Sequence, residues 1–475
     1  MTDPSPPSQT ASFDPNQLHS GETRNLNTTR LLIGLMVPMG MTVLNLSMFG
    51  VALPQIRDAF VAPADLVAWL VTAYTLPFMM FMPFYGRMAD GLGKRRLFII
   101  GIIIFFVGTT LCMVAPTIQV MMVGRVIQGV GTAGVNPLCI AIITDLFPLA
   151  ERGKAMGTWS STGPATSMIG PLLAGFLIDT WNWRAIFVPD LLASVIALYV
   201  VYVQFPVMRA PLRKGFLRSF DWVGMVLLGL AITLIMFFFS SRPITGWEPL
   251  TDWRLLLGAT SWTIAFVLWE QRYSAPLVSF GIFRRANFGI ASLCAGLRMF
   301  MMSGIGFLIP LYLADIHNLG AAGLGVLLTL HSGALLITVR QASGFADRIG
   351  SRAIVVTGLG MQGLTMVYFA FLPASASIVF VGAGLVVHGM VAGLSLAVLH
   401  RASMSHIGQE ESGAAAGLYS MVRFSGNIVG ATLGGVVLQQ ALSQATHAVA
   451  YPRVFLLTAA MGFLGAIAAF RLGND

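Results

Sequence analysis

Four arginines of this 475-residue chain lie inside long apolar runs, where no water stabilises their charge. A charged side chain at the centre of a bilayer costs about 2.5–3.5 kcal/mol on insertion scales. Each of these cations therefore needs a hydrogen-bonding partner, a counter-charge, or a route to the membrane surface. The four residues are Arg125, Arg298, Arg340 and Arg423.

The depths of these arginines favour different explanations. Arg125 lies about two turns inside the run 118–144, and one interpretation is that its side chain extends to the outer surface. Arg298, near the centre of its run, is too deep for that. Arg423 could pair with a lipid headgroup. Arg340 is close enough to the inner surface for its aliphatic chain to carry the guanidinium there.

Few groups in these runs could bind and release a proton. Asp190 is the acid placed to reach a central cavity, but a partner for Arg184 or a charge at the outer surface is an equally good interpretation. His331 and His388 also titrate in principle, although a single histidine in a helix is more often a hydrogen-bonded packing residue. Asp145 and Glu270 lie at the ends of runs, where local pairing is expected.

The runs that hold these residues are long enough to be membrane helices. Hydrophobic residues make up 56% of the chain and charged residues 10%, whereas soluble domains carry about 25% charged residues. The mean hydropathy is +0.79. Since a crossing needs roughly 20 apolar residues, the sequence predicts an all-α membrane protein with fourteen spans, at 31–53, 66–86, 97–116, 118–144, 155–178, 185–206, 221–241, 254–270, 287–314, 322–345, 353–373, 376–400, 412–440 and 453–471.

The distribution of Lys and Arg tests this count. With a cytoplasmic N-terminus, 19 of the 28 cations fall in inside loops or tails, five fall in outside loops, and four lie within spans. Cytoplasmic loops carry this excess in membrane proteins, so both chain ends are predicted to be cytoplasmic. The five cations assigned to outside loops are Arg57, Arg184, Arg242, Arg254 and Arg453.

The net charge of +9 follows from this topology and does not indicate a nucleic-acid partner, because the cations form short clusters between apolar runs facing anionic lipid. Residues 1–30 are polar and contain four prolines, which predicts a disordered cytoplasmic tail and no cleavable signal peptide. The three cysteines lie inside apolar runs and predict neither a disulfide nor a metal site. They are Cys112, Cys139 and Cys294.

A glycine-rich basic loop follows the second span, and a weaker copy of it follows the tenth. The first reads Gly86-Arg87-Met88-Ala89-Asp90-Gly91-Leu92-Gly93-Lys94-Arg95-Arg96, and the second reads Ser343-Gly344-Phe345-Ala346-Asp347-Arg348-Ile349-Gly350-Ser351-Arg352. Gly86 and Asp90 share one face of a helix end, and Gly93 allows a tight turn. The segment resembles the signature loop of the major facilitator superfamily, and two copies are what an internally repeated transporter predicts.

Further stretches resemble the fourteen-span drug:proton antiporter branch of that superfamily. The fourth span contains Arg125-Val126-Ile127-Gln128-Gly129, similar to the arginine motif. The fifth contains Gly163-Pro164 and Gly170-Pro171-Leu172-Leu173-Ala174-Gly175, similar to the antiporter motif, with Ala174 where a second glycine is usual. Gly163, Gly170 and Gly175 are predicted to pack closely on one face, with the prolines bending the helix. The opening of the seventh span, Phe220-Asp221-Trp222-Val223-Gly224, and Trp183-Arg184 before the sixth also match.

The resemblance implies a fold and several residue roles. Two six-helix bundles, 31–206 and 287–475, would flank a connector at 207–286 that carries two extra spans, and the substrate path would run between the bundles. Arg125 with Gln128 would act in proton movement and in holding neighbouring helices, while Arg298 and Arg423 would face the path. The two loop copies would form the inner gate through Gly86, Asp90, Gly93, Lys94, Arg95, Asp347, Arg348 and Arg352, with Asp90 capping a helix of the opposite bundle near Ser412 and Gly413.

One departure from the branch is at the end of the first span. The usual acid falls at Asn45, whose amide can shape a polar site but cannot carry a proton. Proton coupling must then use other groups, with Asp190, His331 and His388 as candidates. The scarcity of acids favours neutral or anionic cargo.

The function implied is export of a lipophilic small molecule by alternating access, with the proton gradient as the energy source and no cofactor. The alternative is a facilitator or sensor on the same fold without proton coupling, which Asn45 motivates. An enzyme is a poor fit because the spans contain no metal-spaced cluster and no Ser/His/Asp grouping. The expected partners are the bilayer of the inner or plasma membrane and a small-molecule substrate; whether a periplasmic adaptor binds is not readable from the sequence.

Overall fold

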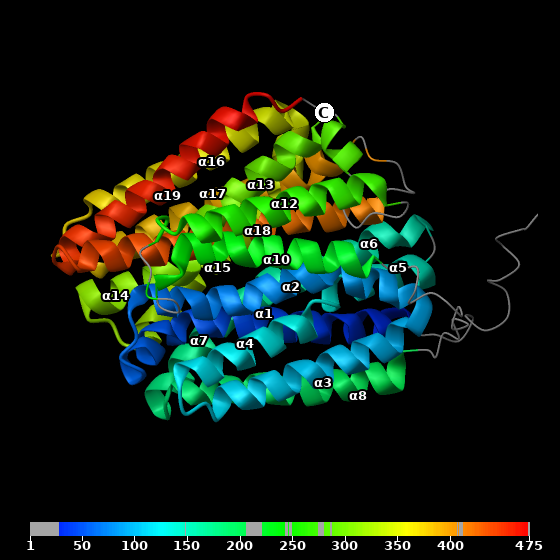
Figure 1. Cartoon of the computed structure of the whole chain (residues 1–475), viewed down its shortest axis with the longest axis horizontal. Coiled ribbons are helices and arrows are strands. Elements are labelled where there is room, and N and C mark those ends of the chain that lie inside the picture. The colour runs from blue at the N-terminus through cyan, green and yellow to red at the C-terminus, as the bar shows by residue number, and fades with distance from the viewer. Residues whose placement is uncertain are drawn as a thin grey trace, which may run out of the picture.

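The computed structural model describes residues 28–147, 149–205, 221–242, 246, 249–273, 280–285, 287–405, 407 and 412–473. Every regular element in these ranges is a helix, and the helices run nearly side by side along one direction (Figure 1). We call the end of this body where the first helix begins and the last one ends the terminal face, and the other end the distal face.

The first group of helices comes from the N-terminal half. It comprises α1 (Thr28–Ala59), α2 (Ala64–Leu92), α3 (Lys94–Met113), α4 (Ile118–Thr132), α5 (Val135–Leu146), α6 (Leu149–Ser160), α7 (Thr162–Thr180), η3 (Trp183–Ile186) and α8 (Phe187–Gln204). Helix α1 packs on α7 and α8, and α3 packs on α4 and α8. The predicted span 118–144 is interrupted between α4 and α5, and 155–178 is interrupted between α6 and α7.

The second group comes from the C-terminal half. It comprises η4 (Phe280–Arg284), α13 (Phe288–Ser303), the π-helical turn η5 (Gly304–Leu308), α14 (Ile309–His317), α15 (Ala321–Ile349), α16 (Ser351–Phe371), α17 (Ile378–Met404), α18 (Ser412–Leu442) and α19 (His447–Ala469). The predicted boundary between the spans 353–373 and 376–400 is confirmed, since α16 ends at Phe371 and α17 begins at Ile378.

Two helices between the groups, α10 (Trp222–Ser240) and α12 (Trp253–Arg272), pack on each other. Helix α10 also contacts α2 and α18, one from each group. The groups themselves meet where α7 packs on α15 and α2 packs on α18. The predicted domain limits stay predictions, because the joints at 206–220 and 274–279 lie outside the described residues.

Twelve helices of the described part are long and apolar enough to cross a membrane. This does not confirm the predicted fourteen, although the all-helical fold fits. The two helices that lie at predicted spans but fall short are α7 and α12. Helix α7 is rich in Gly, Pro, Ser and Thr and is held between α1 and α15, so it needs less contact with lipid.

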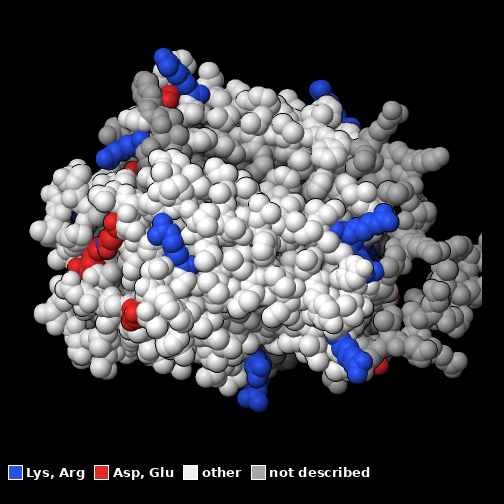
Figure 2. All heavy atoms as spheres, turned by 90° about the horizontal axis from the view of Figure 1, so that it is seen from below, with Lys and Arg blue, Asp and Glu red and all other residues white. Residues whose placement is uncertain are grey.

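The surface agrees with a membrane environment. Figure 2 shows a face that is mostly uncharged, on which Lys, Arg, Asp and Glu form separate small patches. Three of the cations predicted to lie in outside loops are in helices instead, and the predicted side of the membrane stays a prediction: Arg57 lies in the last turn of α1, Arg254 in the first turn of α12, and Arg453 inside α19. These helices extend beyond the apolar runs, because polar residues continue a helix where the membrane ends.

Candidate functional site

A chain of buried polar side chains connects four helices of the first group. The amide of Asn45 on α1 donates from Nδ2 to the Asp190 carboxylate at the start of α8, at 2.7 Å. Its Oδ1 accepts from the Arg125 guanidinium on α4, at 2.8 Å. These two described charges form no direct ion pair; Asn45 bridges them. An amide can donate to an acid through its NH₂ group while its oxygen accepts from a cation.

Arg125 is only 1% exposed, and its guanidinium donates from both Nε and Nη1. It donates to the carbonyl of Leu70 on α2 at 3.2 Å and to Oε1 of Gln128 at 3.0 Å. Its planar group lies 3.9 Å from the ring centroid of Phe49 and 4.4 Å from that of Tyr74. Bonds to α1, α2 and α4 hold these helices together, so the interpretation that Arg125 extends to the surface is wrong.

The helices place these groups by ordinary local chemistry. Thr117 caps α4, and three residues separate Arg125 from Gln128, which puts both on one face of the helix. Gln128 then donates to Thr109 of α3 at 2.9 Å. Tyr74 shares a hydrogen bond with Thr132 at 2.8 Å. Phe49, Tyr74 and Thr109 were not predicted as site residues. Tyr74 and Phe78 are four residues apart in a predicted helix, and this spacing could have indicated an aromatic face.

Asp190 is 1% exposed, and in the described part of the chain no donor bonds to its second oxygen, Oδ1. The alternative in which it pairs with Arg184 is wrong. Arg184 donates to the carbonyl of Ala115 and lies over the ring of Trp183, on the distal side. Asp190 is therefore a carboxyl with one free oxygen inside the bundle, which is a suitable arrangement for binding a proton.

The second group holds its own buried cation. Arg298 on α13 is 3% exposed and donates to the carbonyl of Ala392 at 2.8 Å and to the hydroxyl of Ser395 at 3.1 Å, both on α17. Gln362 of α16 donates to the same hydroxyl at 2.9 Å. The predicted position of Arg298 on the substrate path stays a prediction; what the structure shows is that its guanidinium joins α13 to α17.

The two candidate histidines lie together. Nε2 of His331 on α15 and Nδ1 of His388 on α17 share a hydrogen bond 3.1 Å long, and both rings are buried. Arg423, in the third turn of α18, lies over the ring of Phe424 at 4.7 Å. Phe424 in turn packs against Phe78 of α2 with ring centroids 5.1 Å apart. Phe424 therefore lies at the contact between the two groups, and the predicted position of Arg423 on the substrate path stays a prediction.

A cluster at the distal face, which we call the distal latch, was missed by the sequence analysis. Arg57 at the end of α1 makes two bonds to Asp315 at the end of α14, at 2.6 and 2.7 Å. Tyr451 and His447 of α19 also reach this carboxylate. The side chains of Arg57 and Asp315 are 18% and 7% exposed. Opposite charges at equivalent ends of the first span of each half were the signal available in the sequence.

Two helix N-termini reinforce the distal closure between the groups. Asp179 of α7 accepts from the amide of Ala322 in the first turn of α15, at 3.0 Å. Gln439 of α18 accepts from the amide of Ala64 in the first turn of α2, at 2.9 Å. Each satisfies a backbone donor that a helix leaves unpaired at its start. The two groups are therefore joined at the distal face by three sets of polar contacts.

We expect Asp315→Asn to open the distal face. The amide cannot form the paired bonds of an arginine–carboxylate contact, and charged hydrogen bonds contribute about 1.5–3 kcal/mol each. Spin labels at Trp181 and Val449, which lie at the distal ends of the two groups, should report a longer-distance population in this variant. Arg453→Gln on the same helix as His447 is the control, and an unchanged distance distribution in Asp315→Asn would disprove the latch.

The antiporter-motif glycines divide between two surfaces, which corrects the prediction that they share one face. A Cβ on Gly170 would lie 1.9 Å from the Ser47 hydroxyl, and one on Gly163 would lie 3.3 Å from Met39, both on α1. A Cβ on Gly175 would instead lie 2.6 Å from the carbonyl of Ala321 in α15. The twelve-residue step from Gly163 to Gly175 makes three full turns and about a third of another, so Gly175 points in a different direction from Gly163. Pro171 lies inside α7, whereas Pro164 is in its first turn, where proline is tolerated.

We expect Gly175→Val to prevent closure of the distal face. The approach of α15 to α7 is backbone to backbone, and a Cβ on Gly325 would meet the carbonyl of Pro171 at 2.3 Å from the other side. Transport should fall by roughly tenfold or more, since closing would cost at least about 1.4 kcal/mol. Gly157→Val on α6, where nothing lies within 4 Å, should transport normally. Equal transport by both variants would rule out a role for this contact.

The two copies of the signature loop have the same backbone geometry. Gly93 follows α2 with φ 86° and Gly350 follows α15 with φ 85°, a region that glycine adopts without strain. Lys94 pairs with Asp145, Arg95 donates to the carbonyl of Tyr202, and Arg352 donates to that of Leu472. Each basic residue thus ties its loop to a neighbouring helix end, and the predicted local pairing of Asp145 is confirmed.

Parts of the predicted inner gate cannot be placed. Gly86 lies inside α2 near Pro137, and the side chain of Arg348 is exposed. The side chains of Asp90, Asp347, Ser412 and Gly413 lie outside the described residues, so the predicted Asp90 cap stays a prediction. A carboxylate does cap a helix of the opposite group, but at the distal face, through Asp179.

Known proteins resemble this chain over most of its length. The sequence profile of the Major Facilitator Superfamily matches residues 35–292 and 291–474. The multidrug resistance protein Stp of Mycobacterium tuberculosis (strain CDC 1551 / Oshkosh) is 29% identical over 88% of this chain and 78% of its own. Multidrug resistance protein 3 of Bacillus subtilis (strain 168) is 25% identical over 87% of this chain and 80% of its own.

A solved D-xylose–proton symporter has the same fold, with a TM-score of 0.67 and 13% identity over 94% of this chain and 98% of its own. The profile covers both halves, as the repeated loops and the two helix groups require. The chain therefore belongs to the Major Facilitator Superfamily and is a multi-pass membrane transporter rather than an enzyme.

Proposed function

We propose that this transporter exports lipophilic small molecules in exchange for protons, by alternating access between its two helix groups. The observation that carries the proposal is the Asp190–Asn45–Arg125 chain, in which a buried carboxyl with a free oxygen is connected to a buried cation. The names of the two multidrug resistance relatives support efflux as the direction of transport.

In this proposal the acid that the antiporter branch usually has on the first span has moved to Asp190. Asn45 keeps the position of that acid and connects Asp190 to Arg125. A proton bound by Asp190 would weaken its pull on the Asn45 amide and so alter the bonds that Arg125 makes to α2 and α4. This gives protonation a direct mechanical link to the packing of three helices.

The distal latch supports the alternating part of the proposal. The latch and the two helix N-terminal bonds beside it join the two groups at the distal face, so breaking them would open the path on that side. We infer that the terminal face is cytoplasmic, in the inner or plasma membrane, because most Lys and Arg lie in the loops at that end. The structure then corresponds to a state closed to the outside.

The test uses inside-out proteoliposomes with an acidic lumen. Two probes, rhodamine 6G as a lipophilic cation and fluorescein as a lipophilic anion, report which charge is transported. Proton antiport predicts accumulation of at least one dye that stops when the gradient is collapsed, together with alkalinisation of the lumen. Dye movement that is the same with and without the gradient would contradict antiport and favour the uncoupled facilitator that Asn45 suggests.

A further inference from the structure

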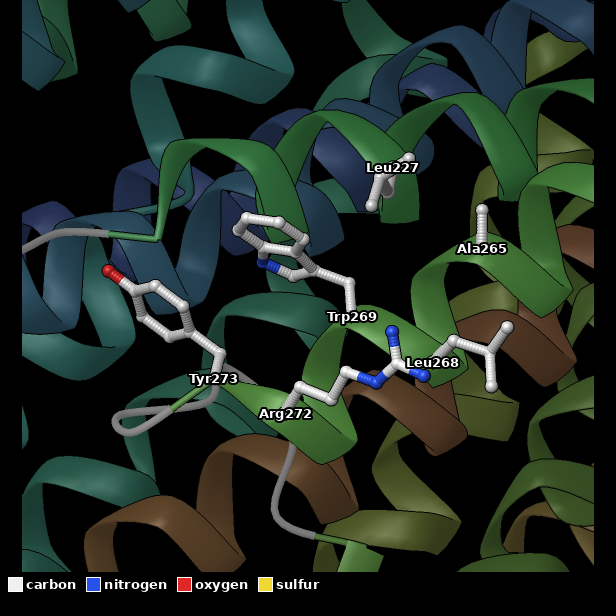
Figure 3. A pocket seen from close by; sticks show the side chains of 6 residues that line it. All are labelled: Leu227, Ala265, Leu268, Trp269, Arg272 and Tyr273. Carbon is white, nitrogen blue, oxygen red and sulfur yellow. The ribbon is translucent and has the colours of Figure 1, made fainter.

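We propose that the two inserted helices, α10 and α12, form a binding site for one anionic glycerophospholipid of the leaflet at the terminal face. A hollow of about 370 Å³ lies between them, lined by Leu227 of α10, by Ala265, Leu268, Trp269 and Arg272 of α12, and by Tyr273 directly after α12. In Figure 3 the side chains from Ala265 to Tyr273 follow one another along α12 and its end, with Leu227 facing them from α10. This site lies outside both helix groups.

The lining changes from apolar to cationic along one face of α12. Ala265, Leu268, Trp269 and Arg272 are three or four residues apart, so they form one stripe about 10 Å long. The small side chain of Ala265 leaves the space that the larger side chains enclose. The walls suit an acyl chain, and the arginine at the end of the stripe suits a phosphate.

The depth of the site in the bilayer matches a lipid headgroup. Trp269 and Tyr273 stack with ring centroids 5.8 Å apart in the last turns of α12. Trp222, which opens α10, packs on Phe84 near the end of α2, so this end of the hollow is at the terminal face. Trp and Tyr concentrate at the level of the headgroups in membrane proteins. Arg272 therefore lies where lipid phosphates lie.

The wall of the hollow is held in place before any ligand binds. Asp221, which caps α10 through the amide of Gly224, also accepts from Nε1 of Trp269 at 2.8 Å. This bond joins the start of α10 to the end of α12. The indole is fixed with one side against α10 and the other toward the hollow.

Charge and exposure identify the occupant. Within the described ranges no carboxylate pairs with Arg272, whose side chain is exposed. Helix α12 carries further exposed apolar residues along its length, Leu257 and Ile264 among them, as a lipid-facing helix does. An arginine that has no carboxylate partner among the described residues and lies above an apolar groove attracts an anionic headgroup, and basic pockets between membrane helices recognise such lipids.

The experiment measures lipid binding rather than transport, so it is independent of the proposed function. Purified protein in neutral detergent is titrated with dioleoylphosphatidylglycerol or dioleoylphosphatidylcholine and followed by native mass spectrometry. We expect one phosphatidylglycerol to bind preferentially, and Arg272→Gln to weaken its binding about fivefold, which corresponds to ~1 kcal/mol. Arg272→Lys should keep most of the affinity, and Ala265→Trp should abolish binding by filling the hollow.

The matched control is Arg254→Gln, which removes a cation from the opposite end of the same helix and should bind lipid as the wild type does. Equal affinity for the two lipids, or equal binding by Arg272→Gln and wild type, would overturn the proposal. A dimer that Ala265→Trp converts to monomer, with lipid binding unchanged, would also overturn it, because a second copy would then be the occupant.

Discussion

Vesicles containing Asp190→Asn should lose gradient-driven dye uptake, by about 100-fold, the upper part of the usual range for coupling between two sites. The asparagine can still accept the bond from Asn45 Nδ2, so the helix packing around it should persist. What it cannot do is bind and release a proton. Initial rates of uptake into inside-out proteoliposomes, at matched protein content, measure the effect.

Two further variants make this test specific to proton binding. Glu151→Gln removes an exposed carboxyl on α6 and should leave uptake unchanged. Asn45→Asp in the Asp190→Asn background returns a carboxyl to the same cluster, next to Arg125, and should restore part of the gradient dependence. If the Asp190→Asn variant still takes up more dye with the proton gradient than without it, the proton site is elsewhere, and His331 and His388 are the remaining candidates.

Replacing Arg125 should have the largest effect on stability. Arg125→Met removes the bonds to Leu70, Asn45 and Gln128 and leaves Asp190 without its nearby positive charge. Removing one member of a buried charged network typically costs about 3–5 kcal/mol. Arg125→Lys should recover little, because a compact ammonium group lacks the planar, spread-out donors of a guanidinium and cannot stack between Phe49 and Tyr74.

The measurement is the free energy of unfolding in mixed micelles titrated with sodium dodecyl sulfate. Arg340→Met provides the comparison, since Arg340 lies in the apolar helix α15 but its side chain is exposed. We expect the comparison variant to unfold at the wild-type detergent fraction. Similar losses of stability in both variants would show that Arg125 acts only through its charge and not through its bonds.

The fold was predictable because solvation acts on each segment separately. Local sequence determines the lengths of the apolar runs, the boundary between the spans 353–373 and 376–400, and the turns at Gly93 and Gly350. The number of spans was harder to predict, and fourteen were expected where twelve helices of the described part are long and apolar enough. Helix α7 packs on both α1 and α15, so the faces that it buries could depart in composition from those of a lipid-facing helix.

The site was predictable only as a set of residue types. The cost of a buried charge singled out Arg125, Arg298 and Asp190 from the sequence, because each lies in an apolar run. Their partners could not be found in the same way. Asn45 and Asp190 are 145 residues apart, and no periodicity within a helix relates them.

The amino-acid sequence by itself determined that the chain crosses a membrane many times, that its two halves repeat, and that a few charges are buried. These properties follow from hydropathy and local backbone preference. The tertiary structure alone decided that Asn45 joins Asp190 to Arg125, that Arg57 meets Asp315, and that Gly175 faces the opposite group while Gly170 does not. Such pairings depend on how helices distant in sequence rotate and cross, and hydrogen bonds form only where that packing brings two side chains within about 3 Å of each other.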